Sequence, residues 1–303
     1  MLKAFPKIFA VGTSYVKEIF NNPVEVTEKL DGSQFVFAKI QGALYFRSKG
    51  KEQSVHNADK LFFPPIEHIC SVQDRLPEGV VFYSEILNKP KHNTLKYDST
   101  PKNGIAIFGA SDVTGTTFVS DHDKLKDLAK GIEVDVVPKL FCGKISSLDE
   151  LQLLLNKISY LGGAEVEGVV VKNFEQQLLL GNCPIPILCA KLVSEQFKEV
   201  HRKTWKAENT GKGKWETFIE GYKTEARWEK AVQHLKESGE LENTYADIGK
   251  LIKEVQKDIT EEEKQIICDF LWREFSGQLL RKSTHGLPEW YKMKIASNAF
   301  RTD

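Results

Sequence analysis

A lysine at the start of a turn is the residue of this 303-residue chain with the clearest potential for chemistry. Lys29 opens the tetrapeptide Lys29-Leu30-Asp31-Gly32, which lies between two β-rich runs. A lysine amine is a nucleophile only when it is neutral, and at its ordinary pKa of about 10.4 roughly one part in a thousand is neutral at pH 7.4. Catalysis by Lys29 therefore requires desolvation, a neighbouring cation or a metal to lower this pKa. Taken alone, the same tetrapeptide is also typical of an ordinary surface turn.

Further along the chain, charged residues interrupt or end apolar runs. Glu85 lies inside the run 81–87, and Glu167 opens the segment Glu-Gly-Val-Val-Val-Lys, which ends at Lys172. A carboxylate in such a place must be paired, bound to a ligand or exposed at an edge. Lys172 and Lys191 each lie at or near the end of an apolar run, where a lysine often only protects the edge of a sheet. No single segment decides between a site and a solvated surface, so their order along the chain matters.

In order along the chain, five segments resemble motifs of the covalent nucleotidyltransferase superfamily, which contains ATP-dependent polynucleotide ligases and mRNA capping enzymes. The segments are Lys29-Leu30-Asp31-Gly32, Arg47-Ser48-Lys49-Gly50, Phe82-Tyr83-Ser84-Glu85, Glu167-Gly168-Val169-Val170-Val171-Lys172 and Ala190-Lys191. The resemblance extends over residues 24 to 194 and implies antiparallel sheets that enclose a nucleotide pocket.

The resemblance also implies a three-step reaction that uses ATP with Mg²⁺ or Mn²⁺. Lys29 attacks the α-phosphorus of ATP, which gives a lysyl-AMP phosphoramidate and releases pyrophosphate. The AMP passes to the 5′-phosphate of a polynucleotide, and a 3′-OH then attacks that end and releases AMP. The implied catalytic residues are Lys29, Glu167, Lys172 and Lys191. The implied nucleotide contacts are Glu28, Lys29, Arg47, Glu85, Phe108 (stacked on adenine), Lys172 and Lys191, with Glu167 as the metal ligand.

The spacing of apolar residues changes near residue 195. Up to residue 194, short β-rich runs are separated by turn residues, and one helix is expected to follow a capping box at Ser147 and Glu150. From residue 195 onward apolar residues recur at helical spacing, and a second capping box, Thr260 with Glu263, predicts a helix start. We therefore expect an α+β fold, with an antiparallel-sheet nucleotidyltransferase domain at 1–194 and an all-helical domain at 195–303.

The helical C-terminal region favours one branch of the superfamily. DNA ligases and capping enzymes carry a β-barrel after the last lysine motif, whereas helices at this point resemble the phage-type RNA ligase 2 family, which seals nicks in duplex RNA. In one departure from the family pattern, Cys189 stands where many members have the first lysine of Lys-x-Lys, and Lys198 or Arg202 are candidate substitutes. Basic and aromatic residues suited to an RNA backbone are Lys203, Trp205, Lys206, Lys212, Lys214 and Trp215.

Composition sets the broad class of protein. The chain is 41% hydrophobic and 28% charged, as in soluble globular proteins, and its zero net charge means that any basic surface is local. Five scattered cysteines without a Cys-x-x-Cys pair indicate reduced thiols rather than disulfides or a zinc site. No apolar run approaches the roughly 20 residues that span a bilayer. We expect a cytoplasmic monomer, cellular or virus-encoded, without a membrane partner.

The residues leave three functions open. The first is an ATP-dependent RNA ligase for RNA repair, which joins 3′-OH and 5′-phosphate ends of RNA, at nicks in duplex RNA. The second is the same enzyme acting on nicked DNA or RNA–DNA hybrids. The third is an RNA-binding protein that has lost catalysis, with Cys189 as the first sign of decay. The presence of Lys29, Glu85 and Glu167 argues against this third function.

Overall fold

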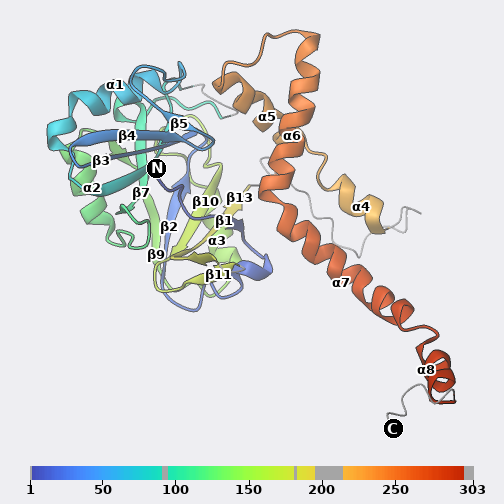
Figure 1. Ribbon diagram of the computed structural model, residues 1–303. Coiled ribbons are helices and arrows are strands. Elements are labelled where there is room, and N and C mark those ends of the chain that lie inside the picture. Colours follow the sequence, from blue (N-terminus) through green and yellow to red (C-terminus); the bar gives the residue numbers. More distant parts are fainter. Residues whose placement is uncertain (1, 91–94, 181–182, 195–213, 297–303) are drawn as a thin grey trace. The chain divides into compact units, whose positions relative to one another are not determined.

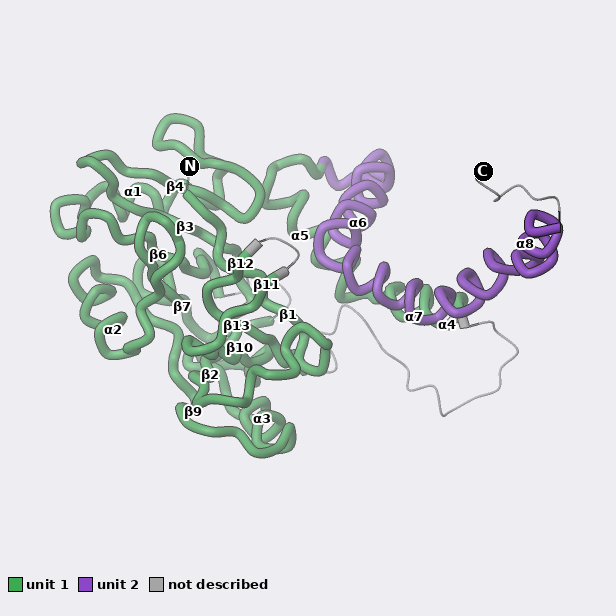
Figure 2. The backbone as a smooth tube through the Cα atoms, turned by 60° about the horizontal axis from the view of Figure 1, so that its bottom comes forward, with its two compact units in different colours: residues 1–241 green, residues 242–303 purple. Residues whose placement is uncertain are grey.

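The computed structural model of the protein describes residues 2–90, 95–180, 183–194 and 214–296 (Figure 1). The chain forms two compact units, residues 1–241 and residues 242–303 (Figure 2). The boundary predicted at 194/195 falls where the undescribed stretch 195–213 begins, so it stays a prediction. The first compact unit extends to Leu241.

Two β-sheets form most of the first unit. In spatial order, the five-stranded sheet consists of β1 (Ile8–Ala10), β13 (Leu188–Val193), β10 (Gly168–Asn173), β2 (Val24–Lys29) and β9 (Lys139–Gly143). The six-stranded sheet consists of β5 (Glu52–Gln53), β4 (Ala43–Ser48), β3 (Ser33–Ile40), β6 (Val80–Ile86), β7 (Ile105–Asp112) and β8 (Asp135–Val136). Neighbouring strands are antiparallel except at the β1/β13 and β7/β8 pairs. A separate hairpin pairs β11 (Leu178–Leu180) with β12 (Cys183–Ile185).

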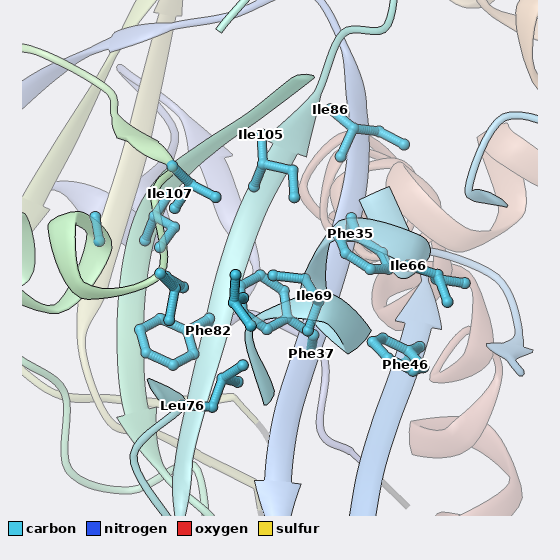
Figure 3. Packing of buried hydrophobic residues seen from close by; sticks show 14 of the residues in the cluster. Phe35, Phe37, Phe46, Ile66, Ile69, Leu76, Phe82, Ile86, Ile105 and Ile107 are labelled. Atoms are coloured by element: carbon cyan, nitrogen blue, oxygen red, sulfur yellow. The ribbon is translucent and has the colours of Figure 1, made fainter. Parts of the chain in front are cut away.

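Helices cover one face of the six-stranded sheet. The helices α1 (Phe63–Ser71) and α2 (His122–Gly131) pack on alternate residues of its strands, because successive side chains of a strand point to opposite faces. Figure 3 shows this core, in which Phe35, Phe37 and Phe82 are completely buried. Short 3₁₀ helices at Gln73–Arg75 and Lys102–Gly104 complete the connections around it.

The five-stranded sheet has its own outer core. Valines of β2 and β10 pack there with Leu151 of α3 (Leu148–Leu155) and with Val16 of the 3₁₀ helix Ser14–Val16. The helix α3 lies where the sequence predicts it. Within the described chain, however, the Ser147 side chain makes no capping hydrogen bond, and Glu150 instead accepts one from the Ser146 amide at 3.3 Å.

The inner faces of the two sheets meet in a third core. Val36, Val81 and Tyr83 of the six-stranded sheet pack with Ile187 and Cys189 of the other. Alternation therefore leaves each sheet with one face toward its helices and one face toward the opposite sheet. Polar side chains on the inner faces must be paired or must serve a ligand.

Two helices follow the undescribed stretch and are the last elements of the first unit. They are α4 (Lys214–Glu220) and α5 (Glu225–Glu237), the latter capped by the Thr224 hydroxyl. From α5, Gln233 donates a hydrogen bond to the Gly32 carbonyl at 3.4 Å, and Glu237 accepts one from the Ser33 hydroxyl. Helix α5 therefore lies against the turn that follows Lys29.

The second unit is helical, as predicted. It contains a 3₁₀ turn at Tyr245–Asp247, then α6 (Ile248–Glu262), α7 (Lys264–Ser283) and α8 (Leu287–Ala296). The predicted helix start at Thr260 is wrong. Thr260 lies inside the last turn of α6, where its hydroxyl donates to the Gln256 carbonyl at 2.7 Å. Throughout the described residues, no helix combines the length and the apolarity needed to cross a membrane.

The contacts of α5 predict how the chain tolerates truncation. A protein that ends at Leu241 should unfold cooperatively, because it keeps the whole first unit. A protein that ends at Ser194 loses both hydrogen bonds to Gly32 and Ser33, which contribute about 1 kcal/mol each, and should be less stable by about 2 kcal/mol. Urea unfolding of the two truncated proteins tests this difference, and equal midpoints and slopes would contradict it.

Candidate active site

The register of the five-stranded sheet places Lys29 on its inner face. Lys29 of β2 pairs with Gly168 of β10. Two residues earlier on β2, Thr27 pairs with Val170, which in turn pairs with Lys191 of β13. Cross-strand partners point to the same face. That face carries Cys189, which packs against the opposite sheet, so Lys29, Thr27 and Lys191 all belong to the inner face.

Lys29 forms a bidentate ion pair with Glu167. Its Nζ donates to Oε1 at 2.7 Å and to Oε2 at 2.6 Å, although the two residues are 138 positions apart. Glu167 precedes β10 directly, beside the strand partner of Lys29. The Lys29 side chain is 28% exposed and that of Glu167 is 11% exposed, so water reaches one side of the pair. This is the geometry expected for a reactive group that is held but accessible.

The ion pair keeps Lys29 positively charged. Burial acts to lower the pKa of Lys29, but the charge of Glu167 and its hydrogen bonds outweigh burial, with smaller support from Glu85 and Asp31, and the pKa is raised. This direction is opposite to the one that a nucleophile needs. The bidentate pair with Glu167 and the raised pKa together favour the protonated form of Lys29 in the absence of a nucleotide.

Glu85 reaches the same place from the other sheet. It lies on β6, and burial raises its pKa to about 8, with the attraction of Lys29 opposing and the charges of Glu167, Glu237 and Asp31 adding to the rise. Gly32 makes this approach possible, because a Cβ atom there would lie 2.7 Å from Cγ of Glu85. Lys29, Glu85 and Glu167 thus meet where the two sheets converge.

Lys191 and Asp31 complete the surroundings of Lys29. The charge of Lys191 acts on Glu167 and opposes the rise of its pKa that burial causes. Asp31 anchors the turn, since its Oδ2 accepts from the Leu95 amide at 2.9 Å and its own amide donates to the Tyr97 hydroxyl at 3.0 Å. Asp31 therefore fixes the turn that presents Lys29.

Three of the predicted site residues lie elsewhere. Lys172 is four residues beyond Gly168, about 13 Å along the strand, and its ammonium is buried against Glu25. Arg47 donates from Nη1 to the Leu2 carbonyl at 2.7 Å. Glu28 points to the opposite face from Lys29, where its carboxylate accepts from the Ser159 hydroxyl and, at 3.2 Å, from the Tyr160 amide.

Phe108 lies on a β-bulge. Tyr83 pairs with Gly109 and Ser84 pairs with Ile107, so Phe108 is an extra residue between two regular pairs of β6 and β7. A bulge re-aims the side chain of its strand. The Phe108 ring packs against the third core and against a neighbouring cluster that contains Leu30 and Leu87. It lies edge-on to Phe5, with centroids 5.1 Å apart.

Several residues of the site carry no motif and were missed by the sequence analysis. Glu25, buried between Val24 and Val26, could have been found by the rule that pointed to Glu85, a charge inside an apolar run. Thr27 is buried on the inner face, and its hydroxyl has no hydrogen-bond partner within the described chain. Gln233 and Glu237 of α5 gave no sequence signal, because only the fold brings them to the turn.

The position of the missing family lysine is deeply buried. Cys189 is the cross-strand partner of Lys172, and burial raises the pKa of its thiol to about 12, so the thiol is neutral. The candidate substitutes Lys198 and Arg202 lie outside the described residues. So do Lys203, Trp205, Lys206, Lys212 and the side chain of Lys214, whereas Trp215 is exposed on α4 and stacks on Phe218.

The carboxylates around Lys29 fit a divalent cation held jointly with a nucleotide. Glu167 and Glu85 offer oxygen atoms, the ligands that Mg²⁺ and Mn²⁺ prefer. In the described part of the chain, no group of three or more metal-ligating side chains would hold an ion alone. Mg²⁺ commonly takes one or two carboxylates together with substrate phosphates, so this donor set suits it.

The raised pKa of Glu85 predicts a pH-dependent stability. Its folded pKa of about 8 exceeds the unfolded value of 4.5, so its stabilising contribution is complete below pH 4.5 and is lost as the pH rises to 8. Glu85→Gln keeps a neutral group, and its Tm should rise relative to the wild type between these pH values and level off above. The exposed Glu52→Gln is the control. A pH-independent difference for Glu85→Gln would contradict the assigned environment.

Comparison with known proteins agrees with the motifs. The family described as RNA ligase matches residues 22–192, more than half of the chain. No curated protein matches this chain. Among solved structures, a Naegleria gruberi RNA ligase with PPi is 15% identical with a TM-score of 0.45, covering 62% of this chain and 55% of that one. A variant of that ligase with ATP and Mn is 16% identical with a TM-score of 0.47, covering 64% and 57%.

In both structures the match spans little more than half of the Naegleria protein. The family match does not depend on them, and it contains Lys29, Glu85 and Glu167, the three residues that meet between the sheets. This chain belongs to the RNA ligase family.

Proposed function

We propose that this protein is an ATP-dependent RNA ligase that joins 3′-OH and 5′-phosphate ends, at nicks in duplex RNA. The single observation that carries the proposal is the cluster of Lys29, Glu85 and Glu167, which two separate sheets bring together. The carboxylate of Glu167 holds the Lys29 amine at a place that is partly open to water, where a nucleotide and a metal ion can approach it. Membership of the RNA ligase family supports a polynucleotide as the molecule that accepts the AMP from Lys29.

Adenylation starts from the paired state of Lys29. The ammonium gives its proton to solvent, which reaches its partly exposed side chain, and the neutral amine attacks the α-phosphorus of ATP. An N–P bond forms, the bond to the bridging oxygen breaks and pyrophosphate leaves. Glu167 would hold Mg²⁺ or Mn²⁺, which supplies positive charge beside the α-phosphate when bound. A Glu167 carboxylate that binds the metal ion would no longer raise the pKa of Lys29. The effect of burial, which lowers this pKa, would remain.

Other residues act on the nucleotide from both sheets. Lys191, on the inner face near Glu167, carries the charge that faces the α-phosphate. Phe108, aimed by its bulge, is the aromatic residue on which adenine stacks. The helical region supplies the contact with RNA, and the sealing steps pass AMP to the 5′-phosphate and release it when the 3′-OH attacks.

The nucleophile is tested by covalent labelling. The wild type, cleared of bound AMP with pyrophosphate and given α-³²P-labelled ATP with Mg²⁺ or Mn²⁺, should carry label on a denaturing gel. Lys29→Ala should carry none, because it lacks the amine that forms the phosphoramidate. Lys126→Ala, an exposed lysine of α2, should label like the wild type. Labelling of Lys29→Ala would overturn the proposal.

The second unit is tested by separating adenylation from sealing. The chain that ends at Leu241 keeps the whole cluster and should self-adenylate at a rate within about tenfold of the full chain, a loss below about 1.4 kcal/mol. It should seal nicked duplex RNA far more slowly than the full chain, and equal sealing rates would contradict a role of the second unit in RNA contact.

The substrate is tested by comparing the rates at which the full-length enzyme seals all-RNA, all-DNA and hybrid nicks. Sealing of DNA nicks faster than RNA nicks would contradict the proposed substrate.

A further inference from the structure

We propose that Lys172 is a positioning residue, which fixes the bulge at Phe108 and thereby the aromatic ring that receives the adenine base. This inference rests on the proposed function, and it replaces the phosphate contact that the sequence resemblance implies for Lys172. It concerns the end of the sheet opposite to the one where Lys29 reacts.

Phe108 is the extra residue of the bulge, because its neighbours Ile107 and Gly109 form the regular pairs with β6. An unpaired backbone carbonyl in a buried place is unfavourable. The Phe108 carbonyl instead accepts a hydrogen bond from Nζ of Lys172 at 2.7 Å. A charged donor makes this bond strong and short. Because Phe108 lies in one sheet and Lys172 in the other, the bond also ties the two inner faces together.

The ammonium of Lys172 is itself held in place. Glu25 is its cross-strand partner, and Oε1 of Glu25 lies 3.2 Å from Nζ. The second oxygen of Glu25 lies 3.4 Å from Nδ1 of His122, at the start of α2. The three side chains are between 2% and 8% exposed, so the network is sealed from solvent. Burial opposes ionisation of Glu25, yet His122 and Lys172 together lower its pKa to about 2, so the carboxylate stays charged.

The network and the aromatic ring line the same small pocket. Its wall includes Glu25, Phe108, His122 and Lys172, together with Phe5 and Phe118. Nζ of Lys172 contacts the Phe108 carbonyl and the Glu25 carboxylate, and the phosphate-handling cluster lies about 13 Å away along the strand. A role in orienting the base therefore fits the position of Lys172, whereas a contact with the attacked phosphate does not.

The test compares two ligands that share a base and differ in phosphates. AMP and the non-cleavable analogue α,β-methylene-ATP are titrated by calorimetry against the wild type and the double variant Glu25→Gln/Lys172→Met. The double variant removes both buried charges, so no carboxylate is left unpaired. Lys126→Ala is the surface control. Thermal unfolding verifies that the variant is folded at the temperature of the titration, and Lys172→Arg, which keeps the charge, should retain more of the binding.

We expect the double variant to bind both ligands about tenfold more weakly, the effect of losing about 1.4 kcal/mol of base stacking. Phe108→Leu should cause a similar loss, and adding it to the double variant should cost little more, because both changes remove one interaction. Weaker binding of the analogue with unchanged binding of AMP would overturn the inference in favour of a phosphate contact. Unchanged binding of both would also overturn it. Failure of the wild type to bind either ligand would instead contradict the proposed function.

Discussion

The ion pair between Lys29 and Glu167 is the interaction on which the proposed site depends. It places an ammonium among the acidic side chains of Glu85, Glu167 and Asp31, where its charge favours the ionised form of Glu167 and of Glu85 against the effect of burial. Attraction between charges strengthens as water is excluded. The pair therefore serves both the fold, by neutralising the junction, and the chemistry, by holding the amine beside the place where a phosphate would lie.

The same two strands carry a second lysine–glutamate pair with a different character. Lys29 and Glu25 lie four residues apart on one face of β2, and Lys172 faces Glu25 across the strand pair. The Lys29 side chain is 28% exposed and that of Lys172 is 3% exposed. Because its amine is open to solvent, Lys29 can exchange Glu167 for a ligand. The buried amine of Lys172 can only hold the Phe108 carbonyl. One strand pair thus supplies the proposed nucleophile at one end and the proposed support of the base at the other.

Patterns within single segments predicted the fold class, the helical C-terminal unit and the strands that carry the motifs. They did not predict the partner of each side chain. Lys172 and Glu25 are 147 residues apart, and the bulge that uses Lys172 depends on the pairing of β6 with β7. The Thr260 capping box failed for a similar reason, because a threonine also bonds back to the carbonyl of the preceding turn inside a helix. The spacing of apolar residues therefore predicts which face of a strand or helix is buried, whereas the partner of each polar side chain depends on the tertiary structure.

The decisive measurement for the Lys29–Glu167 pair is the pKa of Lys29. Chain labelled with ¹³C and ¹⁵N in its lysines, with Lys29 assigned through Lys29→Arg, gives this pKa by NMR titration of the wild type and of Glu167→Gln. We expect a pKa of Lys29 above the ordinary 10.5 in the free wild type and a lower one in Glu167→Gln, where only burial and weaker charges remain. A pKa of Lys29 below 10.5 in the free wild type would show an amine already prepared for attack and would contradict the paired resting state.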